Sequence, residues 1–203
     1  MTRRIAIFIS GRGSNMETLV RALEGHEDAG KVALVLSNKA SAAGLTFAEG
    51  AGLPTAVVSH KGLTREAFEA KVEDHLAAAE IDLICLAGFM RVLSESFSKR
   101  WSGRVLNIHP SLLPSFRGLH VHEQALKAGV AVSGCTVHWV TPELDGGPIV
   151  GQAVVPVERE DTPDTLAARV QKAEHILYPA ALFSVLGIHS DYQQTDDMII
   201  ALR

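Results

Sequence analysis

The chain has 203 residues, 47% hydrophobic and 21% charged, which is enough to bury the core of one globular domain. Its formal net charge of -4 and pI near 6.1 argue against a surface that neutralises many phosphates, so we expect small-molecule partners rather than nucleic acid. The isolated Cys85 and Cys135 fit neither a disulfide framework nor a zinc site, and no apolar run suits a signal peptide or a membrane span; both observations favour a cytoplasmic protein.

Apolar runs of strand length alternate with helical patterns in the first half of the chain. The predicted strands are 5–9, 32–36, 55–58, 83–86 and 105–108, and the predicted helices are about 15–24, 41–51 and 64–79. In the third helix Phe68, Val72, Leu76 and Ala79 fall on one face. Such alternation is typical of a parallel sheet that is covered by helices on both faces.

The pattern changes after about residue 130. Two longer extended runs, 131–140 and 149–157, predict antiparallel strands that are added to the sheet. A last helix should begin at Thr162-Pro163-Asp164, because Thr162 suits the cap and Pro163 the first helical position; its apolar face would be Leu166, Val170, Ala173 and Leu177. We therefore predict an α/β fold in a single domain, 1–203, with halves of about 1–100 and 101–203.

A glycine loop, Ser10-Gly11-Arg12-Gly13-Ser14-Asn15, follows the first strand and opens the first helix. Glycines let the backbone approach a ligand, and the free N–H groups of a helix start favour an anion, so we expect one phosphate here. A dinucleotide is disfavoured because Met16 stands where a third glycine would fall and the second strand ends in Ser37-Asn38-Lys39, without an acid for the ribose. The alternative is a plain strand-to-helix turn in which Ser14 or Asn15 caps the helix.

An amide, an imidazole and a carboxylate lie at the ends of predicted strands. Asn107 and His109 alternate along the extended run before Pro110, so their side chains should point to the same side. Together they could donate to an oxyanion, and Asp145 in Leu144-Asp145-Gly146-Gly147-Pro148 could favour the charged form of His109. Separately, the histidine and the aspartate could each be an ordinary turn residue. As a set they indicate acyl-group transfer.

Four motifs occur in order along the chain: Ser10-Gly11-x-Gly13-Ser14-Asn15, Leu86-Ala87-Gly88-Phe89-Met90-Arg91, Asn107-Ile108-His109-Pro110-Ser111-Leu112-Leu113-Pro114 and the Asp145 segment. With these motifs the chain closely resembles the phosphoribosylglycinamide formyltransferases, from residue 4 to about residue 186. The resemblance implies a Rossmann-like formyltransferase fold. It also implies transfer of a formyl group from the co-substrate 10-formyltetrahydrofolate to the amine of N1-(5-phospho-D-ribosyl)glycinamide, in purine biosynthesis. The N-terminal half would then bind the nucleotide, and the C-terminal half would carry the catalytic and folate functions.

The resemblance also implies a role for individual residues. Gly13, Ser14 and Asn15 would bind the phosphate, and Asn107, His109 and Asp145 would be catalytic. Met90, Arg91, Val92, Leu93 and Asn107 would bind the folate through backbone and side-chain groups. Arg65 would meet the folate glutamate and Glu174 the ribose hydroxyls, unless each is a solvated helix residue. Arg12 receives no role beyond long-range attraction of phosphate.

The same residues bear on other functions and ligands. A formyltetrahydrofolate hydrolase would use the same Asn107, His109 and Asp145 but does not need the phosphate loop, whereas a methionyl-tRNA formyltransferase adds an RNA-binding domain for which this acidic chain has no room. A binding module without chemistry would not need the catalytic set.

His120 and His122 form an H-x-H pair without a third ligand, so we expect no metal. We expect His138 to be a structural histidine that lines the site, and the protein to be a monomer or homodimer.

Overall fold

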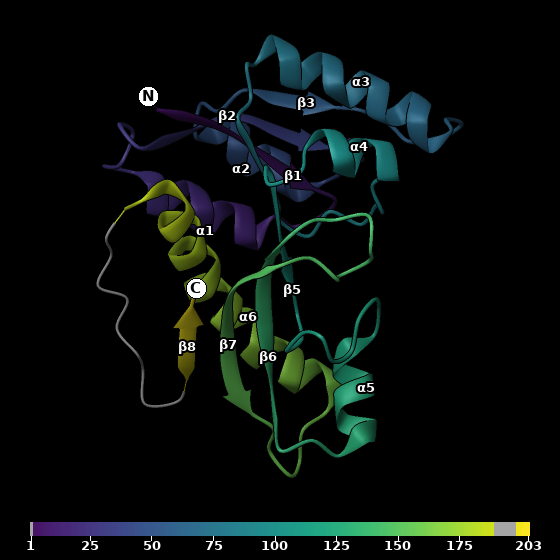
Figure 1. Ribbon diagram of the computed structural model, residues 1–203, viewed down its shortest axis with the longest axis vertical. Coiled ribbons are helices and arrows are strands. Elements are labelled where there is room, and N and C mark those ends of the chain that lie inside the picture. The colour runs from purple at the N-terminus through teal and green to yellow at the C-terminus, as the bar shows by residue number, and fades with distance from the viewer. Residues whose placement is uncertain (1, 189–197) are drawn as a thin grey trace. The chain divides into compact units, whose positions relative to one another are not determined.

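The structure is a computed structural model that describes residues 2–188 and 198–203 (Figure 1). The chain divides into two compact units, Met1–Leu106 and Asn107–Arg203. The strands follow the order β3-β2-β1-β4-β5-β6-β7-β8 in an eight-stranded sheet, and β5 (Val105–His109) contains the boundary between the units. That the units form a single domain stays a prediction.

Unit 1 is a parallel sheet with helices on both faces. Its elements are β1 (Arg3–Ile9), α1 (Ser14–Leu23), β2 (Gly30–Ser37), α2 (Ala43–Gly50), β3 (Thr55–Val57), α3 (Arg65–Ala78), β4 (Leu83–Leu86) and α4 (Glu95–Arg100). β1 pairs in parallel with β2 and β4, and β2 pairs with β3. Parallel strands need crossover connections, and α1 and α3 lie on opposite sides of the strands (Figure 1). The predicted parallel sheet is confirmed.

The core of unit 1 follows from the apolar runs. All side chains from Ile5 to Ile9 are fully buried, as a strand with helices on both faces requires. Helix α3 buries Phe68, Val72 and Leu76 as predicted, whereas Ala79 is its half-buried C-cap. The ring of Phe89, directly after β4, packs edge-on against Phe8 at 5.3 Å and stacks on Phe68 at 6.4 Å between ring centroids. These contacts fix the start of the segment that follows β4.

Unit 2 has antiparallel strands, as the longer extended runs predicted. Its elements are α5 (Val121–Ala128), β6 (Val132–Trp139), β7 (Ile149–Pro156), α6 (Pro163–Leu186) and β8 (Ile199–Leu202). β7 pairs with β6 on one side and with β8 on the other. Helix α6 lies behind β6 and β7 in Figure 1 and buries Leu166, Val170, Ala173 and Leu177 completely. Thr162 caps it and Thr165 completes a capping box, which confirms the predicted start.

Some elements of unit 2 were not predicted. Helix α5 is short, and β8 lies in a tail for which the sequence predicts no structure; residues 193–197 of that tail lie outside the described residues.

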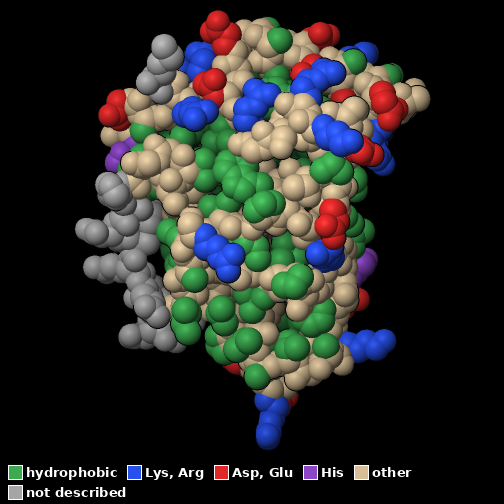
Figure 2. Space-filling view, in the orientation of Figure 1, with side chains coloured by type: hydrophobic (Ala, Val, Ile, Leu, Met, Phe, Trp, Pro, Cys, Tyr) green, Lys and Arg blue, Asp and Glu red, His purple; other side chains and the backbone are tan. Residues whose placement is uncertain are grey.

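Hydrophobic side chains gather on the face of β6 and β7 that α6 leaves open (Figure 2). Val132 on β6 and Ile199 and Leu202 on β8 are exposed. Among the described residues, none of the helices is both long and apolar enough to cross a membrane.

Candidate active site

The glycine loop, residues 10–15, connects β1 to α1 in unit 1. Helix α1 begins at Ser14, and its cap is Gly13 in the left-handed conformation (φ 79°), so the alternative in which Ser14 or Asn15 caps the helix is wrong. Gly13 is enclosed because α2 approaches it closely: a Cβ on Gly44 would lie 3.2 Å from the Cα of Gly13 and 2.7 Å from Cδ1 of Ile9. The Gly44 N–H also donates to the carbonyl of Gly11 at 3.1 Å. The loop therefore presents the N-terminus of α1 on a backbone braced by α2.

The 90–93 segment lies between β4 and α4 and is held at both ends. The Met90 N–H donates to Oγ of Ser10 at 2.8 Å. At the other end the buried carboxylate of Glu69, on α3, accepts bonds from the N–H and the hydroxyl of Ser94, which caps α4. Between these anchors Met90 is 64% and Val92 55% exposed, whereas Leu93 is buried. Exposed apolar side chains on a fixed backbone suit contact with a flat, partly apolar ligand.

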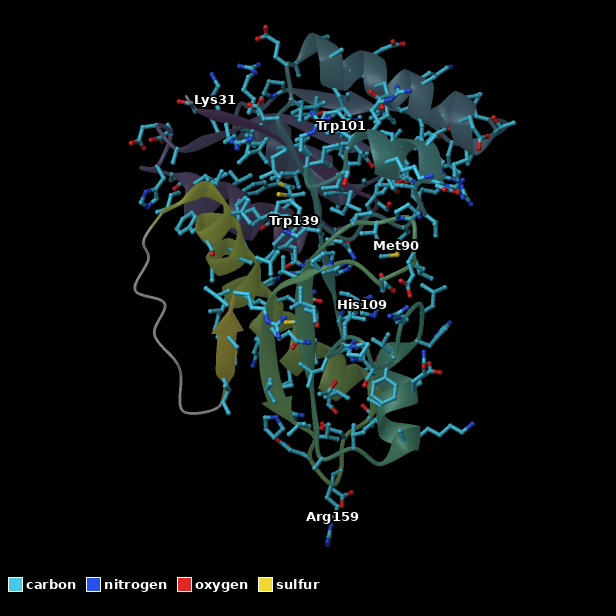
Figure 3. The ribbon with its side chains drawn as sticks, in the orientation of Figure 1. Lys31, Met90, Trp101, His109, Trp139 and Arg159 are labelled. Atoms are coloured by element: carbon cyan, nitrogen blue, oxygen red, sulfur yellow. The ribbon has the colours of Figure 1, made fainter. Side chains whose placement is uncertain are left out.

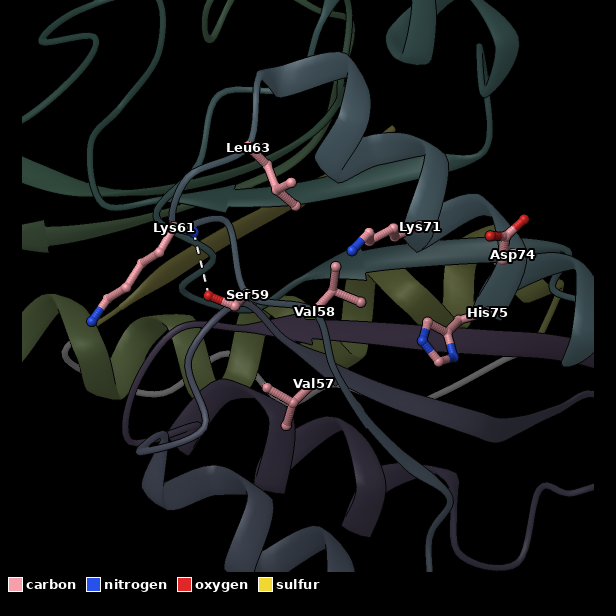
Figure 4. A pocket seen from close by; sticks show the side chains of 8 residues that line it. All are labelled: Val57, Val58, Ser59, Lys61, Leu63, Lys71, Asp74 and His75. Carbon is pink, nitrogen blue, oxygen red and sulfur yellow. Dashed lines mark hydrogen bonds between the residues drawn. The ribbon is translucent and has the colours of Figure 1, made fainter.

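Arg65 is the first residue of α3 and is exposed, after the cap Thr64. Close by, unit 1 has a cavity of about 380 Å³, drawn in Figure 4. It is lined by Val57, Val58, Ser59, Lys61, Leu63, Lys71, Asp74 and His75, none of which the sequence predicted as a site residue. Among the described residues, the buried polar atoms that lack a hydrogen-bond partner all lie outside this lining, so we assign it no ligand.

His109 ends β5 in unit 2 and is buried; Figure 3 labels it. Its Nδ1 lies 3.5 Å from Oδ2 of Asp145, and the two side chains are 6% and 9% exposed. The predicted pair is therefore present. Its Nε2 lies 2.9 Å from the carbonyl of Phe116, which also accepts from the hydroxyl of Ser111 at 3.0 Å. Both ring nitrogens of His109 thus have a partner, because the turn after β5 brings the Phe116 carbonyl back onto the ring.

Asp145 is positioned by the turn between β6 and β7. It adopts the left-handed conformation (φ 49°), which aspartate tolerates better than most residues, and its Oδ2 accepts from the N–H of Gly118 at 2.9 Å. Gly147 lets this turn approach β6, because a Cβ there would lie 1.8 Å from the carbonyl oxygen of Trp139. The N–H of Trp139 donates to the carbonyl of Pro148, which fixes the same approach. The glycines of this motif thus hold the carboxylate beside His109.

Asn107 is half-buried on β5 and contacts His138, which is not part of the predicted catalytic set. Its Nδ2 lies 3.2 Å from Nε2 of His138, whose Nδ1 lies 3.1 Å from the carbonyl of Trp139. Burial lowers the pKa of His138 and outweighs the opposing effects of the Trp139 bond and of Asp145. A neutral ring that donates from Nδ1 accepts at Nε2, so His138 orients the amide of Asn107. The expected structural histidine therefore acts directly on a predicted site residue.

Other predicted residues of unit 2 have different surroundings. Glu174 is 8% exposed, so the alternative that it lies on a solvated helix face is wrong. The pKa of the Cys135 thiol is raised, first by burial of that thiol and second by the negative charge of Glu174. His120 is exposed, whereas His122 is half-buried and its pKa is lowered by burial and by His109. Within the described ranges, no group of three or more His, Cys, Asp or Glu side chains has the arrangement of a metal site.

Comparison with known proteins places these motifs in a family. Residues 3–182 match the family model described as formyl transferase. The chain belongs to the formyl transferase family. Among relatives, the phosphoribosylglycinamide formyltransferase of Escherichia coli is 45% identical over 179 residues, which are 88% of this chain and 84% of that protein. The human trifunctional purine biosynthetic protein adenosine-3 is 50% identical over 180 residues, 88% of this chain but only 18% of that protein.

Solved structures of formyl transferases agree with the fold. The phosphoribosylglycinamide formyltransferase of Brucella melitensis matches with a TM-score of 0.87 at 49% identity and covers 95% of this chain and 100% of its own. The protein of that name from Anaplasma phagocytophilum matches with a TM-score of 0.85 at 46% identity over 92% of this chain and 88% of its own. The predicted Rossmann-like formyltransferase fold is confirmed.

Proposed function

We propose that this formyl transferase moves the formyl group of 10-formyltetrahydrofolate to the amine of N1-(5-phospho-D-ribosyl)glycinamide, in the purine pathway. The observation that carries the proposal is the buried His109–Asp145 pair, to which His138 connects Asn107, in a chain whose relatives bear that enzyme's name. A buried carboxylate next to an imidazole stabilises the imidazolium, which is a strong donor to a developing oxyanion.

In the proposed reaction the glycinamide amine attacks the formyl carbon. A new C–N bond forms, and Asn107 and charged His109 donate hydrogen bonds to the oxyanion of the tetrahedral intermediate. Asp145 holds the imidazole in place at Nδ1, and the N–H of Gly118 holds Asp145 in turn. For Nε2 of His109 to reach the oxyanion, it leaves the carbonyl of Phe116. The bond from the formyl carbon to the folate nitrogen then breaks, and that nitrogen takes the proton that the attacking amine has lost, through water or His109.

The binding roles in unit 1 are proposed from its loops. Gly13, Ser14 and Asn15 bind the ribonucleotide phosphate at the N-terminus of α1, which is supported by the braced loop backbone. Met90, Arg91, Val92 and Leu93 bind the folate, supported by the exposed apolar side chains and the clamped ends of that segment. Arg65 meets the folate glutamate.

Further binding roles and the setting of the protein are also proposals. In unit 2, Glu174 binds the ribose hydroxyls, and its buried position supports that role. The protein works on small molecules as a monomer or homodimer, without a metal. We also propose that it is cytoplasmic, because the chain has only two cysteines, Cys85 and Cys135, both of them buried and too few for a disulfide framework.

The test follows tetrahydrofolate release from formyl-folate with and without glycinamide ribonucleotide. We expect release only when the ribonucleotide is present. An acceptor that lacks the 5′-phosphate should need a much higher concentration, because it cannot use the glycine loop. Equal rates with and without acceptor would instead identify a hydrolase, and no reaction in either case would identify a binding module.

A further inference from the structure

One hydroxyl in unit 1 joins the glycine loop to the 90–93 segment. Ser10 is 5% exposed and directly follows β1. Its Oγ accepts from the Met90 N–H at 2.8 Å and donates to Oδ1 of Asn38 at 2.6 Å. Both distances are those of well-formed hydrogen bonds. Ser10 itself is the first residue of the glycine loop, so its hydroxyl links that loop directly to Met90.

The bonds of Ser10 have a defined direction. A hydroxyl has one proton, and donation of that proton to buried Asn38 leaves the oxygen lone pairs for the Met90 N–H. Asn38 is 2% exposed, and its Nδ2 lies 3.2 Å from Nδ1 of half-buried His60. The amide of Asn38 is therefore fixed from both ends. A polar chain of this kind holds its members more rigidly than separate bonds would.

We propose that Ser10 is a positioning residue that couples nucleotide binding at the glycine loop to folate binding at the 90–93 segment. The inference rests on the proposed function, from which it takes the two ligands. A ligand that orders the loop also fixes Ser10 Oγ, and with it the Met90 N–H at the start of the folate segment. The second ligand then meets a segment that is already ordered, so each ligand strengthens the binding of the other by the same factor.

The test measures the Kd of tetrahydrofolate with and without saturating glycinamide ribonucleotide. This pair lacks the formyl group, so no reaction occurs. In the wild type we expect the ribonucleotide to tighten folate binding by roughly fivefold to tenfold, within the usual range of coupling between sites. In Ser10→Ala the ratio of the two Kd values should fall to about one, even where each Kd has changed. A purely structural role would shift the Kd values but leave their ratio.

Ser98→Ala is the matched control, because Ser98 is a buried serine of the same unit whose hydroxyl has no partner within the described residues. It should keep the wild-type ratio. A wild-type ratio of one, or an unchanged ratio in Ser10→Ala, would overturn the proposal. Absence of binding of either ligand to the wild type would instead refute the proposed function, and the inference with it.

Hydrogen exchange on the wild type keeps the proposal testable should Ser10→Ala fail to fold. Glycinamide ribonucleotide alone should slow exchange of the Met90 amide severalfold. The Ile84 amide, which donates to the carbonyl of Arg104, is the internal reference and should change little. If the ribonucleotide binds and the Met90 amide exchanges at its original rate, the two segments are not coupled.

Discussion

The close approach of α2 to the glycine loop predicts that Gly44→Ala displaces the proposed phosphate site. The added Cβ would lie 2.7 Å from Cδ1 of Ile9 and 3.2 Å from both the carbonyl oxygen of Arg12 and the Cα of Gly13. Ordinary carbon contacts are about 3.5–4.0 Å, so the loop backbone must move by a few tenths of an ångström. Ile9 is fully buried, which leaves its side chain little room to yield.

The matched control is Gly50→Ala in the same helix, where an added Cβ would have no heavy atom of the described residues within 4 Å. Alanine favours a helix over glycine by up to about 1 kcal/mol at either position. Overpacking costs about 1–3 kcal/mol and applies to Gly44 alone. We therefore expect the free energy of unfolding of Gly44→Ala to lie about 1–3 kcal/mol below that of Gly50→Ala.

Urea denaturation measures this difference, and titration with glycinamide ribonucleotide measures its effect on the site. If displacement costs the bound state about 1.4 kcal/mol, the Kd of Gly44→Ala rises about tenfold, whereas that of Gly50→Ala stays near the wild type. The reasoning is refuted if Gly44→Ala is as stable as Gly50→Ala and binds the ribonucleotide as tightly as the wild type does.

Three further predictions concern the proposed site. His109→Ala should lower turnover by about two to four orders of magnitude, as for a lost acid-base group, with little change in ribonucleotide affinity; near-normal turnover would exclude the assigned role. Ser14→Ala combined with Asn15→Ala should mainly raise the Kd of the ribonucleotide, and an unchanged Kd in a titration would count against the phosphate loop. Because burial lowers the pKa of His138 in the folded state, stability from its neutral form is present above the unfolded value of about 6.5 and is lost as pH falls below it. His138→Asn should therefore show a shallower fall in unfolding free energy between pH 7.5 and pH 5.5, and equal slopes would contradict this.

The sequence predicted those elements whose burial imposes a regular pattern. The run Ile5–Ile9 and the α6 face of Leu166, Val170, Ala173 and Leu177 are fully buried, so each position had to be apolar. Helix α4 has too few turns to show a period, and β8 has exposed side chains on both faces, so neither left a signal. Boundaries shifted by a residue or two where strands end in turns, as at β3, which ends at Val57 rather than Val58.

The sequence predicted that His109 and Asp145 lie together, but it did not predict the other contacts of the candidate site. The motifs located Asn107, His109 and Asp145, and the close pair of His109 and Asp145 followed from their chemistry. The bonds from Ser10 to Met90 and from Asn107 to His138 join residues far apart in the chain, and no local pattern encodes them. The carbonyl of Phe116 on His109 depends on the path of a turn backbone, which residue types alone do not specify.

The measurement that tests formyl transfer most directly traces the formyl carbon. The protein is incubated with formyl-folate carrying ¹³C in the formyl group and with glycinamide ribonucleotide, and the products are analysed by mass spectrometry and NMR. We predict that the label appears on the glycinamide nitrogen of the ribonucleotide, in equal amount to the tetrahydrofolate released, and that His109→Ala slows both together. Label found as free formate, with the ribonucleotide unmodified, would contradict the proposed function.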